Sequence, residues 1–267
     1  MALKNLMVHL DSSARTGYRL DMAASLARQH QARLVGVFGQ LAEPSRVGVV
    51  STWPSAEYTQ AAQASKAMFE KATAGLADAD WLDINRGSDV EVRHQIIEHG
   101  RCVDLVILGQ YDEMAPAPVP ADLCEEVIVK SGRPVLVVPF VGDFPSIGTR
   151  PLIAWSDMRE AVRAINDGLP LIQRGADVLI LSSYDEVEAS CQRLLAHLRS
   201  HGIEAKTEVL VGEEVGVMDQ LLNKAGDFGA DLLIMGAHSH GTIPFGSRGS
   251  GTKYILGHMT VPVLMSC

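Results

Sequence analysis

The sequence is poor in the features that mark several large classes of protein. Only 5% of its 267 residues are aromatic, the net charge is −9, and no segment concentrates Lys and Arg. Nucleic-acid-binding proteins depend on positive charge and on aromatic side chains that stack with bases. No apolar run approaches the roughly 18 residues that a transmembrane helix needs. We therefore expect neither a nucleic-acid partner nor a membrane.

Cysteine is also scarce. Cys102, Cys124, Cys191 and Cys267 are far apart and form no CxxC pair, whereas zinc sites and disulfide frameworks usually use closer spacing. The sequence predicts isolated reduced thiols. The N-terminal apolar run meets Asp11 and is too short for a signal peptide, so we expect a cytoplasmic protein.

What the sequence does contain is an internal repeat. Four pairs of segments match in the same order, and a polar stretch with glycine and proline, residues 142–150, separates the two sets. The pairs are 5–11 with 151–157, 87–95 with 212–220, 103–109 with 230–236, and 133–139 with 261–266. The repeat predicts two domains, residues 1–142 and 143–267.

Within each copy, short Val/Ile/Leu runs alternate with longer segments of helical period. Runs that are apolar on both sides suit strands buried in a parallel sheet, and the alternation predicts a doubly wound α/β fold with helices on both faces. In the second copy we expect strands at 151–155, 177–183, 205–211, 230–236 and 261–266, and helices near 158–174, 186–201, 214–228 and 250–258. The first copy adds a long helix over about 55–78.

The segment 231–251, DLLIMGAHSHGTIPFGSRGSG, carries the candidate chemistry. Ser239 follows a predicted strand, as a hydrolase nucleophile does, but no helix follows at once and no acid lies between His240 and Cys267. A serine hydrolase is therefore disfavoured. His238 and His240 lack a nearby acidic or thiol ligand, which disfavours a metal site.

The same segment suits phosphate better than catalysis. It leaves the carboxyl end of a strand and precedes a helix that starts near Ser250. Glycines let backbone N–H groups approach an anion, and a helix N-terminus adds positive potential. The alternative is a glycine-rich loop with a capped helix and no ligand. The segment is not a Walker A loop, because it has no adjacent Gly-Lys-Ser/Thr.

The two-copy layout and the spacing of Gly236, Ser239, Gly249 and Ser250 resemble the universal stress protein family in its tandem form. The resemblance implies two Rossmann-like domains of the adenine nucleotide alpha hydrolase type, each with a five-stranded parallel sheet. It also implies ATP as the ligand, with or without Mg²⁺. The residues implied to bind it are Ala154, Ser156, Ser183, Met235, Gly236, His238, Ser239, Gly249, Ser250 and Gly251.

The two copies depart from the family pattern in different ways. In the second copy, Ser239 stands where the family has a glycine, and Ser156 stands where it usually has an acid. The first copy keeps the acid as Asp11, but Asp112 replaces the second glycine and Asp122-Leu123 replaces Gly-Ser. Acids repel phosphate and prolines lack N–H donors. We therefore expect one nucleotide site, in the second copy, with the first copy as a structural partner.

These expectations define a function. The chain would be a stress-response protein that binds an adenine nucleotide and acts as a sensor or interaction module, without catalysis. The alternatives are a nucleotide-free scaffold and a weak ATPase. The last strands of the two copies, 133–139 and 261–266, would pair with each other to cover their apolar edges. A homodimer is a further partner state that we consider.

Overall fold

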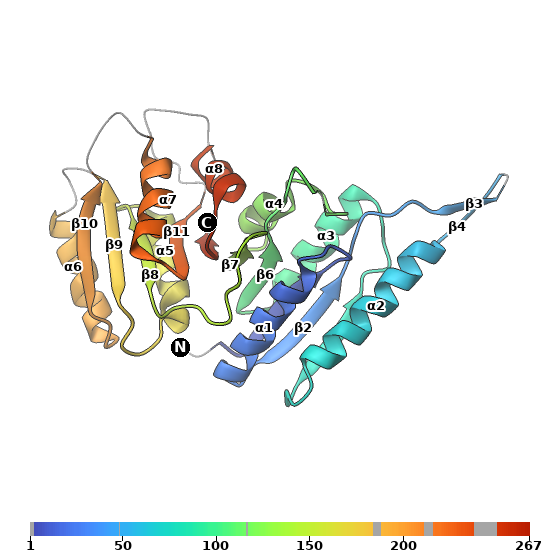
Figure 1. Cartoon of the computed structure of the whole chain (residues 1–267), viewed down its shortest axis with the longest axis horizontal. Coiled ribbons are helices and arrows are strands. Elements are labelled where there is room, and N and C mark those ends of the chain that lie inside the picture. Colours follow the sequence, from blue (N-terminus) through green and yellow to red (C-terminus); the bar gives the residue numbers. More distant parts are fainter. Residues whose placement is uncertain (1–2, 48, 116, 184–187, 211–215, 238–249) are drawn as a thin grey trace. The chain divides into compact units, whose positions relative to one another are not determined.

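The computed structural model describes residues 3–47, 49–115, 117–183, 188–210, 216–237 and 250–267. The chain divides into two compact units between Val135 and Leu136, here called the N-terminal and C-terminal halves. Each half is an α/β unit, and the predicted fold class is confirmed (Figure 1). The domain boundary at residue 142 stays a prediction. None of the described helices is long and apolar enough to cross a membrane.

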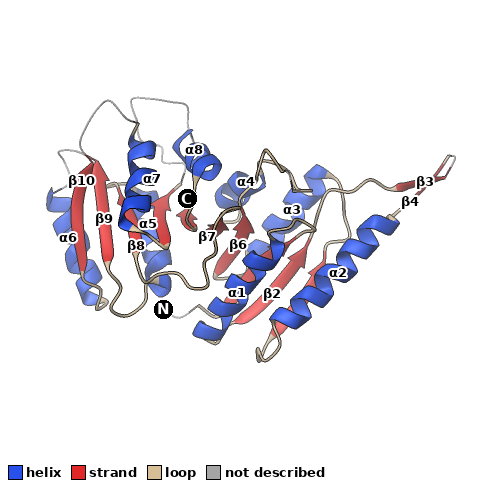
Figure 2. Ribbon diagram, in the orientation of Figure 1, coloured by secondary structure: helices blue, strands red, loops and turns tan. Residues whose placement is uncertain are grey.

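The N-terminal half is built on parallel strands in the order β6-β1-β2-β5. Strands β1 and β6 are buried over almost their whole length, as expected where helices cover both faces. Helices α1 and α2 cover one face, and α3 and α4 the other (Figure 2). The elements are β1 Asn5–Leu10, α1 Thr16–His30, β2 Arg33–Phe38, α2 Ala56–Ala72, β5 Ala79–Asp83, α3 Asp89–Gly100, β6 Leu105–Gly109 and α4 Leu123–Lys130. The division between the halves falls within β7 Val135–Val138.

Local signals explain where the helices of this half begin and end. Helix α2 starts after Ser55, whose side chain accepts a hydrogen bond from the Tyr58 N–H. The helix ends at Ala72, shortly before Gly75 with its φ of +86°. The prediction that it extends to residue 78 was wrong, because left-handed backbone cannot continue an α-helix.

One element of the N-terminal half was not predicted. Strands β3 Ser45–Val47 and β4 Val50–Thr52 pair antiparallel in a two-stranded hairpin. The hairpin extends away from the sheet of its own half (Figure 1). Strands of three residues are too short for a hydrophobic pattern to reveal them.

The C-terminal half repeats the arrangement, with parallel strands in the order β10-β9-β8-β11-β12. All predicted strands and helices are present. Helix α5 is shorter than the predicted 158–174 and ends at Gly168. Pro170 lacks the N–H that an α-helix needs, and it lies in a 3₁₀ turn that follows the helix. The elements are β8 Pro151–Trp155, α5 Arg159–Gly168, β9 Val178–Ser183, α6 Glu188–Ser200, β10 Ala205–Leu210, α7 Val217–Phe228, β11 Leu232–Gly236, α8 Ser250–His258 and β12 Val263–Ser266.

Candidate functional site

The carboxyl ends of three neighbouring strands gather several of the predicted nucleotide residues. Ala154 in β8 pairs in register with Met235 in β11. Ser156 follows β8 directly and is exposed, and Gly236 ends β11. Ser183 ends β9, on the other side of β8. In an open parallel sheet, this edge is where ligands bind.

The remaining predicted residues lie in or near the segment between β11 and α8. His238, Ser239 and Gly249 lie outside the described residues, so their role stays a prediction. Ser250 is the first residue of α8 and Gly251 the second. A Cβ added at Gly251 would lie 2.9 Å from Met218 Cε of α7.

Gly236 also has a packing role. A Cβ added there would lie 2.6 Å from the Ala161 amide nitrogen, because the first turn of α5 crosses close over this strand end. The same Cβ would lie 2.9 Å from Glu160 Cβ. Glu160 has a side chain only 6% exposed, which pairs with Arg159 at 3.1 Å. An acidic side chain therefore starts beside the predicted phosphate-binding edge.

The C-terminal half has a pocket of about 310 Å³ between α5 and α6. Ile165 and Leu194 form apolar parts of its wall, and Asp157 and Arg193, 3.6 Å apart, contribute charge. None of the described residues that line it is one of the predicted nucleotide residues. This pocket is therefore not the predicted nucleotide site.

The strand registers show which residues correspond between the halves. Val8 pairs with Ile107, two residues before Gly109, and Ile153 pairs with Ile234, two residues before Gly236. With these pairs aligned, His9 and Asp11 correspond to Ala154 and Ser156. When the same alignment is continued along the chain, Arg19 of α1 corresponds to Ala164 of α5. His9, Asp11 and Arg19 are buried in the N-terminal half. In the C-terminal half, Ser156 is exposed, Ala164 is buried, and the buried acid near this strand end is Glu160.

In the N-terminal half, these residues form a closed network around Asp11. The Arg19 guanidinium donates to Asp11 Oδ2 at 3.0 Å and to the His9 carbonyl at 2.7 Å. Asp11 Oδ1 accepts from the Ser13 N–H at 2.8 Å and from the Thr16 hydroxyl at 2.5 Å. Asp11 and Arg19 are 4% and 3% exposed. A buried charge pair with this many hydrogen bonds is satisfied without any ligand.

The environment shifts the titration of this network. Burial would raise the pKa of Asp11, but the Arg19 charge, His9 and the hydrogen bonds from Ser13 and Thr16 together lower it below its usual value. Burial lowers the pKa of His9 to about 4, although Asp11 acts in the opposite direction. His9 is therefore neutral near pH 7. Its Nε2 lies 2.8 Å from the Gly39 carbonyl and donates to it.

Arg19 also covers the strand end that would face a phosphate. A Cβ added at Gly109 would lie 2.0 Å from Arg19 Nη1. Cys124, at the start of α4, donates its thiol to the Gly109 carbonyl at 3.2 Å. Burial raises the pKa of this thiol to about 12, so it stays protonated. Side chains of the protein itself thus occupy the surroundings of Gly109.

The segment that replaces the glycine loop in this half is tied to its neighbours. Asp122 pairs with Arg93 of α3 at 2.5 Å. Asp112 Oδ1 accepts from the Met114 N–H at 2.9 Å. The Leu41 N–H donates to the Pro118 carbonyl at 2.6 Å, which joins this segment to the chain after β2. The acids predicted to repel phosphate are thus engaged in contacts within the half.

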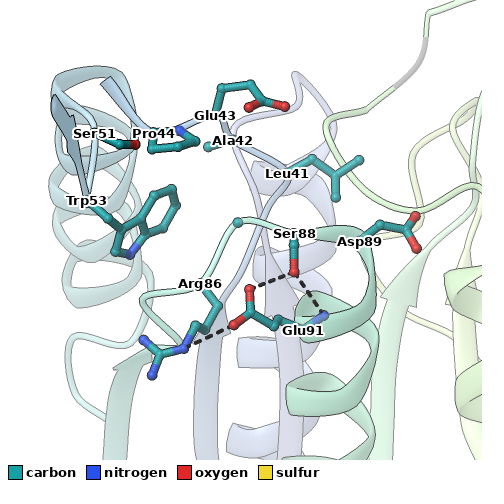
Figure 3. A pocket seen from close by; sticks show the side chains of 11 residues that line it. Leu41, Ala42, Glu43, Pro44, Ser51, Trp53, Arg86, Ser88, Asp89 and Glu91 are labelled. Atoms are coloured by element: carbon teal, nitrogen blue, oxygen red, sulfur yellow. Dashed lines mark hydrogen bonds and ion pairs between the residues drawn. The ribbon is translucent and has the colours of Figure 1, made fainter. Parts of the chain in front are cut away.

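A second feature of the N-terminal half is an open groove of about 1110 Å³ beside the β3–β4 hairpin (Figure 3). It is lined by segment 41–44, by Ser51 and Trp53, and by segment 86–89 with Glu91. The Trp53 indole N–H donates to Asn85, which fixes the ring at one side of the groove. Gly87 allows this packing, because a Cβ there would lie 2.5 Å from the Trp53 ring.

Sequence reasoning did not identify Arg19 or this groove. An arginine on the buried face of a helix, eight residues after an aspartate that ends a buried strand, is a signal that could have indicated the Asp11–Arg19 pair. The groove arises from the hairpin, which has no comparable signal in the sequence.

Three comparisons relate this chain to known proteins. The model of the universal stress protein family matches residues 161–266. A universal stress protein from Archaeoglobus fulgidus DSM 4304 has a similar structure, with a TM-score of 0.70 and 15% identity, covering 98% of this chain and 97% of that one. A functionally unknown protein from Pseudomonas aeruginosa PAO1 reaches 0.61 at 13% identity, covering 99% and 92%. No curated protein matches.

The family match lies in the C-terminal half, and the two structures extend the likeness in fold to the whole chain. Residues 161–266 in the C-terminal half match the universal stress protein family, and the two similar structures share the fold of two tandem α/β units. The resemblance stated from the sequence is confirmed. At these identities, the similar structures support the fold and leave the ligand open.

Proposed function

We propose that this chain binds one adenine nucleotide, ATP, in its C-terminal half and serves as a stress-response sensor or interaction module without catalysing a reaction. The nucleotide would lie at the carboxyl ends of β8, β9 and β11, near Ser156 and Gly236. The loop with Ser239 and Gly249 would contribute the phosphate donors, together with the start of α8. This assignment rests on the sequence spacing and on the contrast between the halves.

The observation that carries the proposal is the absence of the Asp11–Arg19 pair from the corresponding described positions of the C-terminal half. There, Ser156 and Ala164 stand in place of the two charged residues, and Ala154 in place of His9. A nucleotide needs donors and space at this edge, and an internal ion pair would compete for both. The N-terminal half keeps the fold and supplies its own charges there.

Glu160 is the feature that opposes an anion at this edge. Its side chain is buried and begins beside Gly236, so its negative charge would repel phosphate unless it is offset. Arg159 pairs with it, and Mg²⁺ bound with the nucleotide would reduce the repulsion further. We therefore propose Mg–ATP as the bound species.

The test is to denature the protein as purified and assay the supernatant for adenine nucleotide. A tightly bound ligand would be released in an amount close to one per chain. Protein that has been stripped and then incubated with Mg–ATP should regain the same amount. A preparation that releases no nucleotide and takes none up would favour the alternative, a nucleotide-free scaffold.

We further propose that the last strands of the two halves pair with each other. Val135–Val138 and Val263–Ser266 are short, buried strands that are apolar except for Ser266, and an apolar strand edge left in water promotes aggregation. Residues 1–142 expressed alone should be oligomeric or insoluble. A well-behaved monomer of that fragment would contradict the pairing.

A further inference from the structure

The β3–β4 hairpin, residues 45–52, which we call the arm, exposes apolar side chains. Val49 is fully exposed and Val50 is 58% exposed. Two-stranded hairpins are at best marginally stable alone in water. The C-terminal half has only four residues between β9 and α6, too few for such an arm. The arm is therefore an addition to the N-terminal half whose valines need a partner surface.

The groove beside the arm has the size and walls to receive a peptide segment. At about 1110 Å³, it exceeds the roughly 300–1,000 Å³ typical of small-molecule pockets, and it is open to solvent. Trp53 stands on one side, with Leu41 and Ser88 across the hollow (Figure 3). Leu41 and Pro44 add apolar surface. An extended apolar segment would be shielded from water between these walls.

The charges of the groove select for a basic segment. Three acids and one arginine line it. Glu91 pairs with Arg86 at 3.4 Å, and Asp89 pairs with Arg93 of α3. Glu43 is exposed and lies near the arm (Figure 3). A cationic side chain that enters the groove would therefore meet a favourable charge at Glu43.

We propose that the groove receives the arm of a second copy of this chain, in a symmetric homodimer. The arm carries the matching groups, since Arg46 is exposed and lies beside the exposed valines. Ser51 of the arm and Trp53, which follows the arm, both line the groove. In the proposed dimer, a two-fold axis runs next to the arm and each arm enters the groove of the other copy, as an isologous interface requires. Arg46 of one protomer then faces Glu43 of the partner subunit.

The interface is small, because it consists of two arms and two grooves. Interfaces below the standard size of about 800 Å² per partner are usually weak. The dimer should therefore form in the micromolar range of protein concentration. The proposal does not depend on the nucleotide, so the dimer should form equally in stripped protein.

The test is sedimentation equilibrium of the full chain over a wide concentration range. Arg46→Glu and Glu43→Arg should each raise the dimer dissociation constant by roughly tenfold or more, because each creates two like-charge contacts in the dimer. The double variant with both changes reverses the pair and should recover most of the affinity. Val49→Asp combined with Val50→Asp should leave monomer only. Val209→Asp, at an exposed valine of β10, is the matched control and should leave the constant unchanged.

The charge reversal keeps the test decisive even if a substitution disturbs the arm. Recovery in the double variant supports the proposal, since an unfolded arm could not respond to a charge in the groove. A monomer at all concentrations would overturn it. A dimer that is unaffected by the arm variants, or that the double variant fails to recover, would do so equally.

Discussion

The two halves of this chain share a fold and differ at one edge of the sheet. In the N-terminal half, Asp11 and Arg19 form a buried, fully hydrogen-bonded pair at the ends of β1 and β6. In the C-terminal half, Ser156 and Ala164 occupy the corresponding positions. The same α/β fold thus carries a buried ion pair at this edge in one half and lacks it at the corresponding positions of the other. The fold alone does not assign the ligand.

Removing the arginine of the pair should have the largest effect. Arg19→Ala leaves Asp11 buried without its partner, and breaking a buried pair costs about 3–5 kcal/mol. Urea unfolding, followed by Trp53 and Trp81 fluorescence in a Trp155→Phe background, measures this loss in the N-terminal half. Arg33→Ala is the matched control, because its ion pairs are exposed and should contribute less than about 1 kcal/mol.

The double variant Asp11→Ser with Arg19→Ala sharpens the comparison, since it installs the residues of the C-terminal half. It removes the uncompensated charge and should recover part of the stability lost in Arg19→Ala. A loss below about 1 kcal/mol for Arg19→Ala alone would show that the pair does not hold this edge together.

Acidification should weaken the N-terminal half next. The pKa of buried His9 is lowered from 6.5 to about 4. The unfolded state therefore takes up a proton at a higher pH than the folded state does. The contribution of neutral His9 to the free energy of unfolding is fully present above pH 6.5. It is lost as the pH drops toward 4, and the total loss is about 3 kcal/mol. The Asp11 contribution is lost only at lower pH, because its pKa is depressed.

His9→Gln should remove this pH dependence between pH 6.5 and 4, since it keeps an N–H donor but does not titrate. Unfolding of the N-terminal half by urea at a series of pH values measures the slope. A slope that is unchanged in the variant would assign the acid sensitivity to other groups. The corresponding residue in the C-terminal half, Ala154, makes no such contribution.

Exchanging the loop residues tests the ligand side of the comparison. Gly249→Glu should abolish ATP binding, because it adds bulk and negative charge where donors worth roughly 1.5–3 kcal/mol each are expected. Ser239→Ala should lose only part of the affinity. If the unmutated protein had an esterase activity that Ser239→Ala abolished, Ser239 would instead be a catalytic nucleophile.

The reciprocal exchange, Asp122→Gly with Leu123→Ser, gives the N-terminal half the missing Gly-Ser. We expect no new ATP site, since the Asp11–Arg19 pair and Cys124 still surround Gly109. Calorimetry on this variant would show a second site if the loop residues alone decided binding.

The smallest expected effect is at Glu160. Glu160→Gln removes the negative charge beside Gly236, so ATP should bind a few-fold more tightly without Mg²⁺ and depend less on the metal. Titrations with and without Mg²⁺ measure this. Equal Mg²⁺ dependence in both proteins would place the Glu160 charge away from the phosphates.

Much of the fold followed from the sequence because strands buried on both faces leave continuous apolar runs, as 105–109 and 232–236 do. The predicted start of α2 and end of α7 agree with the structure, where Ser55 and Gly229 cap these helices. The end of α5 was missed because the effect of Pro170 outweighed the amphipathic pattern. The arm was missed because strands of three residues are too short to show an alternation of apolar and polar residues.

The candidate site was predictable only in part. Spacing identified the strand ends, and the strand register places Ala154 beside Met235, while their role in binding stays a prediction. The Arg19 pair depends on the packing of α1 over β6, which no local pattern reveals. Gly236 was assigned to phosphate alone, whereas the structure also gives it a role in the packing of α5.

The most direct measurement is the number of ATP sites per chain. Isothermal titration of the stripped, unmutated protein with ATP and Mg²⁺ should give one site, and Gly249→Glu should remove it. Two equal sites would contradict the account, because the N-terminal half would then bind despite its Asp11–Arg19 pair. No binding in the presence of Mg²⁺ would contradict it as well.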